Sequence, residues 1–195
     1  MSGVADEVTT VVACRFVRGR NALLCAADFG PVFMDVYLHL GQTGVVLGGG
    51  ADEKLKLLLA ALTLHASSRP HAETIAWTLH LEDERMNLFG VAENPTGHVT
   101  GQLFTENVRA TGGNVLHAEV AGPGGERRRS SVEVGGSDLL GAAAEYYARS
   151  EQRPARYFAL GGDRFALLAA QPDCDTDWLE NVGTEEVGAL SADDS

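Results

Sequence analysis

The sequence of 195 residues contains few cysteines, and none of them forms a recognisable pair. Cys14, Cys25 and Cys174 are far apart and form neither C-x-C nor C-x-x-C. A sparse, odd set of this kind indicates reduced thiols rather than a disulfide framework. Because Cys14 and Cys25 lie in apolar, strand-like segments, we expect both thiols to be buried or inert.

Positive charge and long apolar runs are also scarce. Lysine and arginine number 15 against 27 acidic residues, which gives a net charge of −12. An acidic surface repels phosphate groups, so neither nucleic acid nor an anionic membrane is an expected partner. The chain lacks the run of about 18 apolar residues that a membrane-spanning helix needs. Its first residues, MSGVADEVTT, do not resemble a signal peptide. We therefore expect a soluble, cytoplasmic protein.

The motifs of ligand-binding loops are present only in fragments. Asp173, Asp175 and Asp177 match three positions of a calcium-binding loop, but Trp178 and Thr184 stand where glycine and glutamate are required. The simpler interpretation is that these carboxylates lie at a helix N-terminus. The glycine-rich VVLGGGADEK lacks both phosphate-loop patterns, which favours a flexible connection before a helix.

Motifs of catalysis are missing as well. The histidines form no H-x-x-x-H pair, and there is no G-x-S-x-G. They are His39, His65, His71, His80, His98 and His117. We therefore predict that the protein is not an enzyme; a metal-assisted enzyme built from histidines that meet in space is the alternative.

One short basic stretch, GERRRSS at 125–131, stands out in this acidic chain. On a strand Arg127 and Arg129 would share a face, where they would pair with acids or protect a sheet edge. A phosphorylation site is the alternative.

What the sequence does contain is clear periodicity. Residues 73–81 alternate, with Ile75, Trp77 and Leu79 on one face. Other strands are predicted at 9–16, 21–27, 86–92, 98–108, 114–120, 127–134, 155–160 and 164–172. Helices are predicted at 30–41 with Pro31 in the first turn, at 52–65 capped by Asp52, at 137–150 capped by Ser137, and once more after Asp175. This order predicts an α+β fold, with a mixed, largely antiparallel sheet and helices packed on it.

The stretch EYYARSEQRPARYF, residues 145–158, joins the third predicted helix to a strand. Pro154 biases Arg153 away from helix and places the break near 150–152. This stretch closely resembles the signature of the heat-shock protein 33 family of redox-regulated holdase chaperones. The matching residues are Glu145, Tyr146, Tyr147, Ser150, Glu151, Gln152 and Pro154. The similarity covers roughly residues 9 to 190, weakly from 65 to 85 and strongly from 122 to 158, and it includes RFVRG, LKLLLAALTL and MNLFGVAE.

The resemblance implies a fold, a function and partners. Residues 1–176 would form the family's N-terminal chaperone domain, and 177–195 a helix at the start of its linker followed by an acidic tail. The function implied is ATP-independent holding of unfolded client proteins, with a possible homodimer; the client-binding residues are not indicated. For the signature itself we expect a structural role, in which Glu151 and Gln152 bond backbone groups left free at the helix end and Pro154 fixes the turn.

The chain departs from the family in one respect. Family members continue into a small domain whose four cysteines, in C-x-C and C-x-x-C, hold zinc and act as a redox switch. No such motif occurs in this sequence, so the resemblance implies the chaperone domain without a zinc cofactor or its switch. Three alternatives remain open: a holdase active without oxidation, a truncated and inactive fragment, or a specific protein-interaction module on the same fold, which the glycine-rich segment 41–51 would suit.

Overall fold

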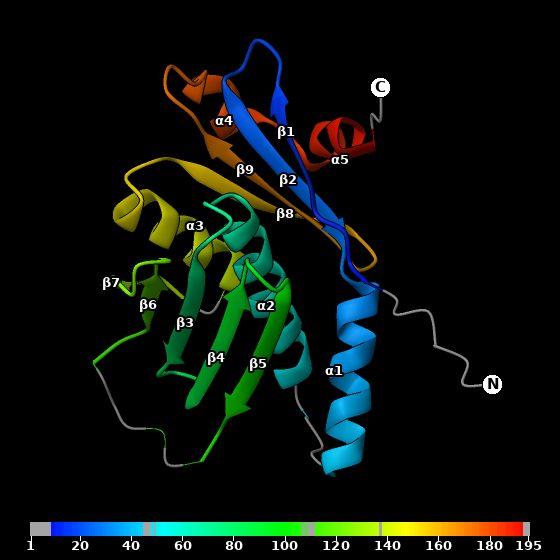
Figure 1. Cartoon of the computed structure of the whole chain (residues 1–195), viewed down its shortest axis with the longest axis vertical. Helices are drawn as coiled ribbons and strands as arrows, with labels where there is room; N and C mark the ends of the chain where they lie inside the picture. The colour runs from blue at the N-terminus through cyan, green and yellow to red at the C-terminus, as the bar shows by residue number, and fades with distance from the viewer. Residues whose placement is uncertain are drawn as a thin grey trace, which may run out of the picture.

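The computed structural model describes residues 9–44, 48, 50–106, 108, 112–136 and 138–192. Its strands form two antiparallel sheets (Figure 1). The four-stranded sheet has the order β1 (Ala13–Val17), β2 (Ala22–Asp28), β9 (Arg164–Ala170), β8 (Ala155–Gly161). The five-stranded sheet has the order β5 (His98–Phe104), β4 (Met86–Glu93), β3 (Thr74–Leu81), β6 (Val115–Ala121), β7 (Arg127–Glu133). The helices are α1 (Gly30–Thr43), α2 (Ala51–Ser67), α3 (Leu139–Ser150), α4 (Thr176–Asn181) and α5 (Thr184–Ala192).

The predicted α+β class is confirmed. All pairings between the strands above are antiparallel, as their short sequential spacing indicated. The alternation predicted in β3 is also confirmed, because Ile75, Trp77 and Leu79 are all buried. The pattern did not indicate that β1, β2, β8 and β9 form a sheet of their own.

Helix α2 forms the centre of the molecule. It contacts strands of both sheets and α3, and most of its side chains are buried. A pair of opposed glycines on β4 and β5, Gly90 and Gly101, lets the helix lie close to the sheet. A Cβ at Gly101 would lie 2.7 Å from Leu59 Cδ2 and 3.0 Å from Leu55 Cδ1. The leucines of α2 therefore pack where Gly90 and Gly101 leave the sheet without side chains.

The beginning of helix α1 packs against the four-stranded sheet. Phe29 and Phe33 lie against Phe165 of β9, with ring centroids 5.9 and 6.2 Å from it. The helix has Pro31 in its first turn, as predicted. Figure 1 shows the remaining turns of α1 standing beside the five-stranded sheet.

The predicted cap of α2 is wrong, and α3 is capped by a residue that we did not predict. Helix α2 begins after Gly50, which has a φ of 82°, and Asp52 lies inside its first turn. The Oδ2 atom of Asp52 instead accepts a hydrogen bond from the Tyr37 hydroxyl, at 3.1 Å. Helix α3 is capped by Asp138, whose Oδ1 accepts a hydrogen bond from the Leu140 N–H at 3.2 Å. The predicted cap, Ser137, lies outside the described residues.

The C-terminal residues form two short helices where we expected one. Val182 leaves the helical conformation, with a ψ of 131°, and separates α4 from α5. Leu179, Val182 and Val187 are buried against the face of the four-stranded sheet that points away from α2. The division between a chaperone domain ending at 176 and a linker region from 177 stays a prediction.

Candidate functional site

The residues of the resemblance motif lie at the end of α3 and in the turn to β8. Helix α3 ends at Ser150, Glu151 follows as its C-cap, and Gln152 has a φ of 55°. A left-handed residue just after a helix is a common way to end it, although glycine is the usual choice. The Pro154 carbonyl then accepts a hydrogen bond from the Ala170 N–H at 2.9 Å, which leads the chain into the four-stranded sheet.

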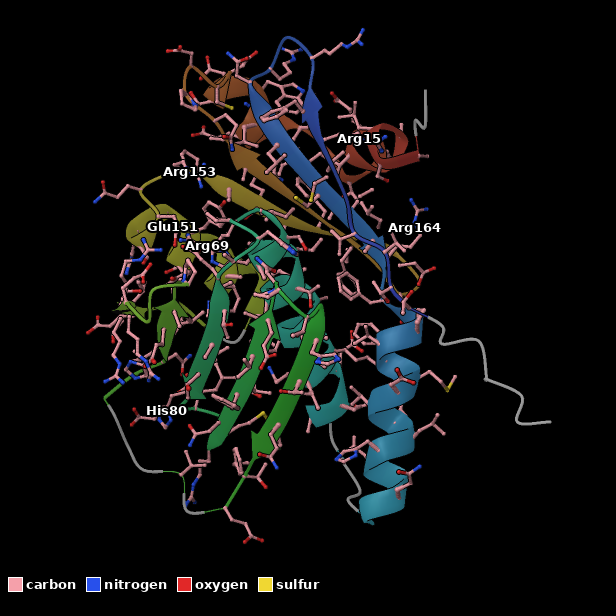
Figure 2. The ribbon with its side chains drawn as sticks, viewed as in Figure 1. Arg15, Arg69, His80, Glu151, Arg153 and Arg164 are labelled. Carbon is pink, nitrogen blue, oxygen red and sulfur yellow. The ribbon has the colours of Figure 1, made fainter. Side chains whose placement is uncertain are left out.

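We had expected the Glu151 carboxylate to bond backbone groups at the helix end. It pairs instead with a buried arginine. Its partner is the guanidinium of Arg69, which lies just beyond α2. Arg69 also holds Glu73, at 2.7 Å between Nε and Oε2, and Glu73 accepts from Arg128 of β7 at 2.9 Å. The side chains of Arg69, Glu73 and Glu151 are only 7, 12 and 16% exposed. Arg69, Glu73, Glu151 and Arg128 together form the Arg69 cluster, which joins α2, α3 and the five-stranded sheet. Figure 2 labels Arg69 and Glu151 of this cluster.

The two tyrosines of the motif point into the core beside a buried histidine. The His65 ring of α2 lies 5.6 Å from Tyr146, 5.2 Å from Tyr147 and 5.0 Å from Trp77, measured between centroids. Neither of its ring nitrogens has a hydrogen-bond partner among the described residues. Burial, with smaller contributions from the charges of Arg69 and Arg153, lowers the pKa of His65 to about 3. His65 is therefore a neutral part of the core at ordinary pH.

The remaining motif residues make further links around the end of α3. Tyr147 shares a hydrogen bond of 3.1 Å with the Ser68 hydroxyl and lies under the Arg153 guanidinium. The Ser150 hydroxyl donates to Ser130 of β7 at 2.9 Å. In the middle of the helix, Glu145 accepts a hydrogen bond from the Gly135 N–H at 3.2 Å. These contacts are compatible with the expected structural role of the motif, which stays a prediction.

Sequence reasoning missed Arg69 and Glu73, which link this site together. Neither residue belongs to a motif, and both lie far from Glu151 along the chain. Only the folded arrangement brings them to the end of α3.

The aspartates of the incomplete calcium motif lie at the start of α4. Asp175 caps that helix, since its Oδ1 accepts from the Trp178 N–H at 3.0 Å, and it pairs with Arg20. The hydrogen bond from Trp178, and then Arg20, lower the pKa of Asp175. The prediction that Asp175 lies at a helix N-terminus is confirmed.

The basic stretch lies on the edge strand β7. Arg127 and Arg129 both pair with Glu119 of β6, at 3.0 and 2.6 Å. The predicted pairing with nearby acids is therefore confirmed, and phosphorylation stays an alternative.

The histidines are dispersed, and the chain offers a poor set of zinc ligands. His39 and His98 face one hollow of about 430 Å³ beside α1, whereas His65 and His80 are buried elsewhere. Among the described residues no group of three or more His, Cys, Asp or Glu side chains could hold a metal ion. Three cysteines do not fit a four-cysteine zinc site.

Several large apolar side chains remain exposed. Met34 and Leu38, one helical turn apart on α1, are 60 and 56% exposed. Phe16 of β1 and Phe104 of β5 are exposed on the two sheets. None of the described helices combines the length and apolar character needed to span a bilayer.

Comparison with known proteins relates this architecture to a chaperone. No protein-family model matches the sequence, and no curated protein matches it. Among solved structures, the chain is similar to the 33 kDa chaperonin (heat-shock protein 33 homolog) of Thermotoga maritima, with a TM-score of 0.68 and 14% identity. The match covers 93% of this chain and 70% of that chain.

The class that these observations define is an α+β protein with two antiparallel sheets around a central helix. The particular fold is that of heat-shock protein 33. The resemblance seen in residues 145–158 is thus matched by the fold of nearly the whole chain.

Proposed function

We propose that this chain is a holdase-type molecular chaperone domain that binds unfolded proteins without ATP. The observation that carries the proposal is the structural match to a 33 kDa chaperonin over 93% of the chain. The motif at the end of α3 supports it, because its residues take part in the contacts that join α3 to the rest of the fold. On this proposal the domain acts without the cysteine-bound zinc switch of the family.

The exposed apolar side chains on α1 support binding of unfolded proteins. Met34 and Leu38 are neighbours on the helix surface because they are four residues apart. Exposed apolar groups of this kind commonly mark sites of protein interaction. The net charge of −12 would keep a complex with an unfolded client in solution, although the client exposes apolar groups.

Several further properties belong to the same proposal. The partners are unfolded or misfolded proteins, and the domain forms a homodimer in its working state. It acts in the cytoplasm, has no enzymatic activity, and does not bind nucleic acid or membranes.

Titration with several unfolded proteins tests this function. Fluorescently labelled clients of unrelated sequence, held unfolded, are mixed with the chain, and binding is followed by anisotropy. A holdase binds all of them with comparable affinity and ignores the same proteins when folded. Binding to none of them, or to one alone, would overturn the proposal, and the second result would favour a specific interaction module.

A further inference from the structure

Two of the cysteines lie side by side in the fold, although no sequence motif pairs them. Cys14 of β1 lies directly opposite Cys25 of β2 in the antiparallel register. Side chains of directly opposed residues point to the same face of a sheet. Opposed Cα atoms in such a ladder are about 4.5 or 5.5 Å apart, and both values fall within the range of about 4.4–6.8 Å that a disulfide spans.

The two thiols have very different surroundings. Cys14 is exposed on β1, an edge strand. Of the expectation that both thiols are buried or inert, burial is therefore wrong for this residue. It borders a hollow of about 350 Å³ that a small oxidant can enter. Cys25 is completely buried in the core cluster around α2. One sulfur is thus open to reagents in solution, and the other is reached only through the first.

The thiols also interact with each other. The Cys14 thiol donates a hydrogen bond to the Ser67 carbonyl at 3.7 Å, and the neighbouring Cys25 thiol lowers the pKa of Cys14. The interaction with Cys14, then burial, raises the pKa of Cys25 far above its ordinary value. A thiolate is the reactive form of cysteine, and exposed cysteines with a lowered pKa are oxidised first.

We propose that Cys14 and Cys25 form a redox-active dithiol, which hydrogen peroxide converts to an intramolecular disulfide and which reducing thiols regenerate. This assignment is independent of the proposed chaperone function. It concerns residues of the folded domain itself, and no metal takes part.

The reaction has two steps. The Cys14 thiolate attacks one oxygen of the peroxide, the O–O bond breaks, and a sulfenic acid forms while the leaving hydroxide takes a proton to become water. The Cys25 sulfur then attacks the Cys14 sulfur, the S–O bond breaks, and the leaving hydroxide takes the Cys25 proton. In total the two thiols lose two electrons and two protons, and one peroxide is reduced to two molecules of water.

Cys174 provides an internal control. It belongs to the apolar cluster between α4, α5 and the opposite face of the four-stranded sheet. The sheet separates it from Cys25, so oxidation of the folded chain should leave its thiol free.

The test uses the folded, fully reduced chain treated with hydrogen peroxide, followed by quenching, denaturation, alkylation and mass spectrometry. We expect the number of alkylated cysteines to fall from three to one, the intact mass before alkylation to fall by two hydrogen atoms, and a peptide pair joined by Cys14 and Cys25. Dithiothreitol should restore all three thiols. Circular dichroism before and after oxidation checks that the chain stays folded throughout.

Variants make the result specific. Cys14→Ser, at an exposed position, should abolish the intramolecular disulfide and leave the fold intact, whereas Cys174→Ser should form the disulfide as the unaltered chain does. Cys25→Ala, with Cys25→Ser as a second form, should leave Cys14 to accumulate as a sulfenic acid that dimedone traps.

The proposal is overturned if all three thiols of the folded chain survive peroxide, if Cys14 forms only disulfides between two chains, or if Cys174 is consumed instead of Cys25.

Discussion

At the scale of single residues, the site depends on a buried arginine that holds two carboxylates. Arg69 lies between Glu73 and Glu151, and all three side chains are largely shielded from water. A buried ion pair does not add much stability over apolar packing, but removal of one partner leaves an uncompensated charge. Arg69 is therefore expected to be far more sensitive to substitution than the exposed arginines of β7.

Substitution of Arg69 tests this expectation. Arg69→Met should lower the free energy of unfolding by about 3 kcal/mol, because Glu151 loses its partner while Glu73 keeps Arg128. Urea denaturation followed by circular dichroism measures the change. Arg127→Met is the matched control, since this side chain is 65% exposed and its ion pair is expected to contribute about 1 kcal/mol or less. Equal effects of the two substitutions would contradict the account of the Arg69 cluster.

The lowered pKa of His65 predicts how the free energy of unfolding depends on pH. Its pKa is about 3 in the folded chain and about 6.5 in an unfolded chain. Between these values the unfolded chain binds the extra proton, so acid favours unfolding. The contribution of His65 is fully present above about pH 6.5 and is lost as the pH falls toward 3, by at most about 1.4 kcal/mol per pH unit.

The pH dependence is measured by urea denaturation at several pH values between 7 and 4. His65→Gln should flatten the curve in this range, and His65→Phe, which keeps a ring in the core, should do the same. His71→Gln, at an exposed position, serves as the control. If the curves of the two His65 variants run parallel to that of the unaltered chain, His65 does not have the depressed pKa on which the prediction rests.

At the scale of elements, the close approach of α2 to the five-stranded sheet depends on glycines. Gly90 and Gly101 are opposed on β4 and β5, and the leucines of α2 occupy the space above them. A side chain there would have to displace the helix or its leucines. The position of α2 in turn places His65 and Arg69 at the end of α3.

Gly101→Ala should therefore destabilise the fold by about 1–3 kcal/mol, the usual cost of an overfilled core. Gly188→Ala in α5 is the matched control, because a Cβ there meets nothing within 4 Å. Alanine in a helix is favoured over glycine by about 1 kcal/mol, so the control should be neutral or slightly stabilising. Thermal unfolding of both variants distinguishes the effects; a Gly101 variant as stable as the control would show that the contact is not tight.

Helix α1 gives a second prediction at this scale, which rests on the proposed function. The double substitution Met34→Ser and Leu38→Ser should weaken binding of unfolded clients several-fold without changing thermal stability, because both side chains are exposed. Gln42→Ser, also exposed on α1, is the control. Unchanged anisotropy titrations with the double variant would mean that clients bind at another surface.

The sequence was most informative about elements and least informative about their assembly. Alternation in residues 73–81 predicted which face of β3 is buried, and the pattern of residues 52–65 predicted a helix there. The opposition of Cys14 and Cys25, or of Gly90 and Gly101, depends on strand register, which a single strand pattern does not reveal. Likewise, the pairing of Arg69 with Glu151 joins residues that come together only when α2 and α3 pack.

At the scale of the whole molecule, the fold combines a well-filled core with a strongly acidic exterior. The core includes α2 and the inner faces of both sheets, while exposed apolar groups remain on α1, β1 and β5. A holdase requires such a combination, since it must stay folded and soluble while it presents apolar surface to a client.

The most direct test of the chaperone function is aggregation of a chemically denatured protein diluted into reducing buffer without ATP, followed by light scattering. We predict that this chain suppresses scattering at near-stoichiometric amounts, whereas a folded control protein of similar net charge does not. Unchanged scattering, with circular dichroism showing that the chain is folded, would contradict the proposal that this fold acts as a holdase here.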